Sequence, residues 1–145
     1  MHDYPHHYKV AAAAQLDGDV SLTGEGLETI PSAPPLQFGG PGDKWSPETL
    51  LVASVADCFI LTFRAIARAS KLSWISLKCE VEGTLQRGDG KTRFTDFVVH
   101  ATLVVPQDTD EARAQRLLEK AEESCLITNS LSSATHLEAT VSRTS

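Results

Sequence analysis

Residues 46–64 read SPETLLVASVADCFILTFR, and this stretch decides the predicted fold. Serine suits a helix N-cap, proline suits the first turn because it has no N–H to satisfy, and Glu48 follows where the helix dipole favours a carboxylate. The residues after it are apolar nearly all round, which predicts a helix from Pro47 to about Lys71 that is buried on most sides. A helix this apolar in a small chain suggests that a partner subunit helps to cover it.

The composition is that of an ordinary globular protein, with 145 residues and enough apolar side chains for one core. Lysine and arginine number 13 against 19 acidic residues, and the net charge of −6 argues against binding nucleic acid or an anionic membrane. No apolar run looks long enough to span a membrane, because an Asp and an Arg interrupt the longest one, and the N-terminus lacks a secretory pattern. We therefore expect a cytoplasmic protein with a single domain over residues 1–145.

The other predicted elements follow from alternation, turn residues and helical periodicity. The expected strands are 6–15, 20–24, 27–31, 75–86, 92–105 and 135–143. Strands 75–86 and 92–105 are expected to form a hairpin with its turn at 88–91. A second, amphipathic helix is expected over 108–124 with Asp108 or Thr109 as its cap, and a turn or short helix follows it. This order of elements predicts an α+β fold with a mainly antiparallel sheet.

The chain has three cysteines, Cys58, Cys79 and Cys125. None lies in a CxxC motif or at zinc-ligand spacing from another Cys or His, and the histidines are scattered, so we assign no metal and no cofactor. Structural disulfides are rare in the cytosol, which leaves core packing or redox chemistry as the role of each thiol.

Each candidate residue also has a plain structural interpretation. Cys79 lies on the apolar face of an alternating strand and is best explained as core packing. Cys58 follows Asp57, an acid that must reach solvent, an interface or a partner, since an unpaired buried carboxylate is costly. Cys125 ends the second helix; if a short helix begins just after it, the backbone N–H groups there would favour a thiolate. Glu48, taken alone, is explained by the helix dipole.

Together these residues form a pattern. GGPGDKWSPETLLVASVADCF at 39–59, followed by SCLITNSL at 124–131, resembles the OsmC/Ohr family of osmotically inducible and organic hydroperoxide resistance proteins, in particular its general OsmC-like subgroup. The resemblance covers most of the chain, including the long hairpin. It implies an OsmC-like fold in which a mainly antiparallel sheet wraps around a long buried helix. It also implies an intertwined homodimer with two sites at the interface.

The resemblance further implies a Cys-based thiol peroxidase that reduces organic hydroperoxides to alcohols in oxidative-stress defence. Cys58 would match the peroxidatic thiol, which becomes a sulfenic acid, and Cys125 the resolving thiol, which closes a Cys58–Cys125 disulfide. Glu48 would match the acid that holds a catalytic arginine against the first cysteine. A small dithiol, such as a lipoyl-type reductant, would then reduce the disulfide.

The sequence departs from the family pattern at that arginine, because residues 1–63 contain none. Without a cation, a nearby Glu48 would raise the pKa of the Cys58 thiol. Arg64 lies six residues beyond Cys58, at the wrong helical angle, and Lys9 and Lys44 are the only basic residues upstream. A second subunit could supply a replacement, with Arg87 and Arg93 as the candidates.

The missing arginine favours an alternative function, in which a non-catalytic dimer of the same fold binds an apolar small ligand in the interface cleft. The presence of both cysteines and Glu48 favours the peroxidase.

Overall fold

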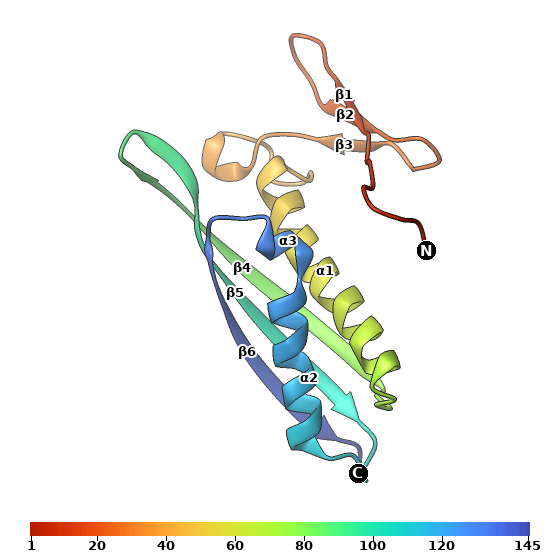
Figure 1. Cartoon of the computed structure of the whole chain (residues 1–145). Helices are drawn as coiled ribbons and strands as arrows, with labels where there is room; N and C mark the ends of the chain where they lie inside the picture. Colours follow the sequence, from red (N-terminus) through yellow and green to blue (C-terminus); the bar gives the residue numbers. More distant parts are fainter. The chain divides into compact units, whose positions relative to one another are not determined.

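The computed structural model describes all 145 residues, which form two compact units, Met1–Leu51 and Val52–Ser145 (Figure 1). The long helix α1 (Pro47–Ala69) runs from the first unit into the second.

The first unit holds a small antiparallel sheet with strand order β1-β2-β3. Its strands are β1 (Ala11–Ala13), β2 (Val20–Thr23) and β3 (Ile30–Ser32), and a single 3-10 turn, η1 (Leu36–Phe38), follows. The strand predicted over 6–15 is reduced to three alanines, in keeping with the weak strand preference of alanine. Large apolar side chains of this unit stay exposed, among them Leu16, Leu27 and Phe38.

The start of α1 is capped as the sequence predicts. The backbone N–H of Thr49 donates to Ser46 Oγ at 3.1 Å, and the backbone N–H of Ser46 donates to Thr49 Oγ1 at 2.8 Å. This reciprocal pair is a capping box with threonine in the third position. The helix ends at Ala69, where Lys71 takes a left-handed φ of 57° and the N–H of Leu72 donates to the carbonyl of Ala67.

Within this chain α1 is buried along one face only. The buried side chains recur at every fourth residue: Val55, Phe59, Phe63 and Ala67. Leu61, on another face, is 50% exposed, so the predicted burial on most sides is not met by this chain alone. The expectation that no segment could span a membrane was wrong, because α1 is long and apolar enough by length and composition. Core helices of globular domains pass the same test.

The second unit is built on a three-stranded sheet with order β4-β5-β6. Strands β4 (Ser76–Gly88) and β5 (Lys91–Val105) form the predicted hairpin, and both turn residues, Asp89 and Gly90, have positive φ, as a tight two-residue turn requires. Strand β6 (Ala134–Arg143) pairs with β5 in parallel, which the sequence did not predict. The other strand pairs are antiparallel, so the mainly antiparallel sheet is confirmed.

The parallel pairing follows from the crossover between β5 and β6, which contains α2 (Glu111–Ser124) and α3 (Leu126–Asn129). Asp110 caps α2 by accepting from the backbone N–H groups of Ala112 and Arg113, so the predicted caps Asp108 and Thr109 were wrong. The helix starts later than predicted because residues 106–109 form a turn in which Thr109 N–H donates to the carbonyl of Pro106.

The core of the second unit lies between the sheet and its helices. Alternate residues of β5 are buried on one face: Phe97, Val99, Ala101, Leu103 and Val105. Figure 1 shows α1 and α2 over this face of the sheet. From α2 the buried side chains are Ala114, Leu118 and Ala121. This packing places the middle of α1 near the junction of α2 and α3, where two of the three cysteines lie.

Candidate functional site

Cys58 is held half-buried in the middle of α1. One helical turn further on, Thr62 places its Oγ1 3.7 Å from Cys58 Sγ, a hydrogen bond of normal length for sulfur. Residues four apart in a helix lie on the same face, so this contact follows from the backbone geometry.

Cys125 lies between the end of α2 and the start of α3 and is only 2% exposed. The Cys58 and Cys125 side chains lie close enough to shift each other's pKa, and both cysteines are free thiols in this structure. The packing of α2 and α3 against α1 therefore brings together the two cysteines that the sequence singled out.

Two opposing effects set the pKa of Cys58. Burial raises it, because a charge is poorly solvated there, but four donors favour the thiolate: the backbone N–H of Ile127, the Cys125 thiol, the Thr62 hydroxyl and the backbone N–H of Leu126. The donors outweigh burial, so the pKa of Cys58 is lowered. The first-turn N–H groups of a helix have no partners within the helix and are free to stabilise an anion.

The other two thiols behave differently. Burial raises the pKa of Cys125, and the neighbouring Cys58 adds to the increase, although the backbone and hydroxyl of Thr128 favour the Cys125 thiolate. Burial and the charge of Cys125 raise the pKa of Cys79 to about 11. Cys58 is thus the only one of the three whose surroundings favour the nucleophilic thiolate. The raised pKa of Cys79 is consistent with the core-packing role predicted for a thiol on the apolar face of a strand.

The donors around Cys58 are uncharged. Within Val52–Ser145, no Lys or Arg side chain contributes to its lowered pKa. Arg64 and Arg87 are exposed, and Arg93 is exposed and donates to the carbonyl of Phe94. In this unit, backbone N–H and hydroxyl groups therefore do what a guanidinium would do for the thiolate.

The sequence predicts only part of this donor set. It indicates a short helix after Cys125 whose N–H groups would favour the Cys125 thiolate, whereas the N–H groups of Leu126 and Ile127 favour the Cys58 thiolate. Thr62 was missed altogether. Its four-residue spacing from Cys58 was the signal that could have identified it.

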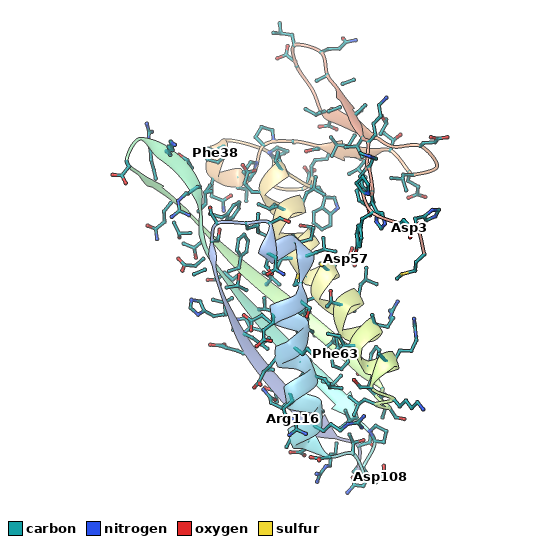
Figure 2. All side chains as sticks on the ribbon, in the orientation of Figure 1. Asp3, Phe38, Asp57, Phe63, Asp108 and Arg116 are labelled. Carbon is teal, nitrogen blue, oxygen red and sulfur yellow. The ribbon has the colours of Figure 1, made fainter.

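Glu48 is separated from Cys58 by ten residues of the same helix. At 1.5 Å per residue the two positions are about 15 Å apart along the helix axis, too far for direct contact within one chain. Glu48 Oε1 is buried and has no hydrogen-bond partner in this chain. Asp57, next to Cys58, is exposed, as predicted for an acid on the solvent side of the helix (Figure 2).

No group of three or more His, Cys, Asp or Glu side chains is arranged to hold a metal ion. The first unit has an open pocket of about 390 Å³ on the loop before α1. It is lined by Pro31, Gly42, Asp43, Lys44, Trp45 and Thr49.

A family model described as "OsmC-like protein" matches residues 40–140 of the chain. The chain belongs to the OsmC-like family. A protein of uncharacterised function from Bacillus subtilis, YmaD, is 30% identical over 100 residues, which cover 67% of each protein.

Solved structures of family members share the fold. An OsmC-like protein of unknown function from Vibrio cholerae aligns with a TM-score of 0.86 at 18% identity, covering 94% of this chain and 100% of that one. An organic hydroperoxide resistance protein from Legionella pneumophila aligns with a TM-score of 0.75 at 25% identity, covering 97% and 99%. Another from Elizabethkingia anophelis aligns with a TM-score of 0.74 at 23% identity, covering 97% and 100%. The OsmC-like family thus includes proteins named for resistance to organic hydroperoxides.

Proposed function

We propose that this protein is a thiol peroxidase that reduces organic hydroperoxides, with Cys58 as the attacking thiol and Cys125 as the resolving thiol. The observation that carries the proposal is the contact between the two cysteines together with their opposite pKa shifts. A thiolate is the nucleophile in peroxide reduction, whereas a resolving thiol must wait for the sulfenic acid. We place this activity in the cytoplasm on the basis of composition.

The reaction has three steps. The Cys58 thiolate attacks the outer oxygen of ROOH, the O–O bond breaks, and the alkoxide leaves as ROH after taking a proton from solvent. The sulfur is now a sulfenic acid, Cys58–SOH. The Cys125 thiol attacks that sulfur, a disulfide forms, and the hydroxide leaves as water. An external dithiol then reduces the disulfide by two thiol–disulfide exchanges and is itself oxidised to a disulfide.

The proposal includes a homodimer. Outside its single buried face, α1 leaves apolar side chains such as Leu61 half-exposed, and the first unit exposes several more. Exposed apolar side chains that gather on one surface mark protein interfaces. An obligate interface of this kind buries more than about 2,000 Å² in total.

A dimer also gives Glu48 a role. Its carboxylate lies too far along α1 to reach Cys58 of its own chain, and one of its oxygens is buried without a partner. We propose that Glu48 acts across the subunit interface, where it meets a cationic or hydrogen-bonding group of the second copy. Arg87 and Arg93 are the candidates for that cation.

The test is peroxide consumption by the purified, reduced protein with a dithiol such as dihydrolipoamide as electron donor. We expect catalytic turnover of cumene hydroperoxide and t-butyl hydroperoxide. Turnover of hydrogen peroxide should be slower, because the side chains of α1 around Cys58 are mostly apolar and favour an organic substituent. Cys58→Ser should be inactive, and Cys79→Ser should match the unmodified protein. Absence of turnover with every organic peroxide and dithiol tried would reject the proposal.

The alternative, a dimer that only binds an apolar ligand, is not favoured. A passive binding cleft has no need for a thiol whose pKa is lowered by several donors and which contacts a second thiol.

A further inference from the structure

We propose that Thr62 is a positioning residue for Cys58. The Thr62 hydroxyl holds the Cys58 sulfur in place and donates a hydrogen bond to the thiolate that attacks the peroxide. This inference rests on the proposed function and deepens it. It assigns to an uncharged side chain of α1 part of the work expected of an arginine.

The geometry that carries the proposal is local to one helix. Thr62 Oγ1 lies 3.7 Å from Cys58 Sγ, and both side chains are half-buried, so water competes poorly for the contact. A threonine hydroxyl in a helix either bonds the carbonyl four residues earlier or turns to a neighbouring side chain. Here it faces the sulfur. The rigid α1 backbone fixes the spacing of the two residues, so the hydroxyl is in place before the peroxide arrives.

Thr62 differs from the other donors in where it comes from. The N–H groups of Leu126 and Ile127, and the thiol of Cys125, reach Cys58 from α3 and the residue before it. Those contacts depend on how α3 packs against α1. The Cys125 donor is also lost when the disulfide forms, because its sulfur is then bonded to Cys58. Thr62 is the donor that stays with Cys58 through every step.

No charged side chain of this chain lies against the Cys58 sulfur, so the Thr62 hydroxyl can affect the pKa of Cys58 measurably. Cys125 is the titratable group that faces Cys58, and it acts as a neutral donor from the α2–α3 junction. On α1 itself the neighbouring Asp57 and Arg64 are both exposed, and Cys79 on β4 is uncharged at neutral pH with its pKa of about 11. No cation of this chain contributes to the lowered pKa of Cys58, so within one chain the loss of the hydroxyl is not masked by a stronger interaction.

A purely structural role for Thr62 makes a different prediction. Valine has nearly the shape of threonine and the same branching at Cβ, so Thr62→Val removes the hydroxyl and leaves the packing. If Thr62 only fills space, this change leaves the titration of Cys58 as it is.

The experiment follows the pH dependence of iodoacetamide alkylation at each cysteine of the reduced protein, resolved by peptide mass spectrometry. In Thr62→Val we expect the alkylation rate of Cys58 at pH 6.5 to fall about threefold to tenfold, since a tenfold change corresponds to one pKa unit. Thr62→Ser should restore it. The matched control is Thr102→Val, which makes the same change at an exposed position on the opposite face of the sheet.

Cys79 of the same protein is the internal control, because its slow alkylation should be unchanged in every variant. An unchanged Cys58 profile in Thr62→Val, or a Thr62→Ser variant no better than Thr62→Ala, would overturn the proposal. If Thr62→Val also exposes Cys79, the fold has opened, and the Thr62→Ser and Thr62→Ala pair decides. Alkylation needs no peroxide, so a protein that fails to reduce peroxides would reject the proposed function and still give a readable result for Thr62.

Discussion

Cys58 and Cys79 are two half-buried thiols in the same unit of the protein, yet their surroundings push them in opposite directions. Burial raises the pKa of both. At Cys58 four donors reverse this effect, whereas at Cys79 nothing opposes it and the charge of Cys125 adds to it. The donors around each thiol, and not its burial, therefore decide which of the two has the lowered pKa.

The donors differ because the backbone differs. Cys79 lies in β4 and is paired with Ala101 of β5, and no backbone N–H group or side-chain donor lowers its pKa. Cys58 faces the first turn of α3, where the N–H groups of Leu126 and Ile127 have no partners within their helix. Backbone N–H groups of α3 therefore lower the pKa of Cys58, and no such groups act on Cys79.

The largest expected effect comes from removing each thiol in turn. Cys58→Ser should lower the rate of organic peroxide reduction at least about a thousandfold, because the nucleophile is lost. Cys79→Ser should change that rate less than about twofold. Steady-state peroxide consumption at pH 7 measures both, and equal losses in the two variants would remove the distinction between the cysteines.

The second effect concerns what Cys125 contributes. Without an added reductant, Cys125→Ser should rapidly consume one equivalent of peroxide as Cys58 becomes the sulfenic acid, because no disulfide can form; any further oxidation to the sulfinic acid consumes a second equivalent. Trapping with dimedone, followed by peptide mass spectrometry, should place the adduct on Cys58. Full turnover in Cys125→Ser, or an adduct on Cys79, would contradict the assignment of Cys125 as the resolving thiol.

The third effect is a change in the alkylation rates of Cys58 and Cys79 when the protein is unfolded. With a pKa of about 11, native Cys79 has a thiolate fraction at pH 7 about a hundredfold below that of the same thiol in the unfolded chain, whose pKa is near 9.0. Alkylation of Cys79 should therefore accelerate by about that factor in denaturant. Cys58, which has a lowered pKa when folded, should slow down on unfolding. An acceleration of similar size at both sites would contradict the account.

The smallest effect is on stability. Cys79→Ala removes one half-buried sulfur and should lower the free energy of unfolding by about 1 kcal/mol at pH 7. The raised folded-state pKa means that burial of the neutral Cys79 stabilises the protein fully below about pH 9 and that this contribution is lost as pH rises toward 11. Denaturant unfolding of the unmodified protein should show that decline. Cys79→Ala should show less of it, and an identical decline would assign it to other groups.

Much of the fold could be predicted from the sequence because its signals are local. The Ser46–Pro47 start of α1, the Asp89–Gly90 turn and the alternation of the hairpin each depend on neighbouring residues, and the structure contains all three. The parallel pairing of β5 with β6 was not predictable in this way. The direction of β6 relative to β5 depends on the path of the α2–α3 crossover, and no local sequence pattern predicts that path.

In the candidate site, too, residues with a local sequence signal could be predicted and the others could not. Cys58 and Cys125 stood out through their motifs, and Thr62 could have been found from its helical spacing. The hydrogen bonds from the backbone N–H groups of Leu126 and Ile127 to the Cys58 sulfur could not have been predicted, because every residue except proline has such a group. Glu48 illustrates the opposite case. Its place in the motif pointed to Cys58, but the rise of α1 separates the two within one chain.

The central claim is that hydrogen-bond donors of this chain lower the pKa of Cys58. The most direct test is a pH titration of alkylation at all three cysteines of the reduced, unmodified protein, resolved peptide by peptide. The account predicts that the pKa of Cys58 lies below 9.0, the value of an unperturbed thiol, that the pKa of Cys125 lies above it, and that the pKa of Cys79 is about 11. A Cys58 that titrates at or above the ordinary value, alongside Cys125 and Cys79, would contradict it.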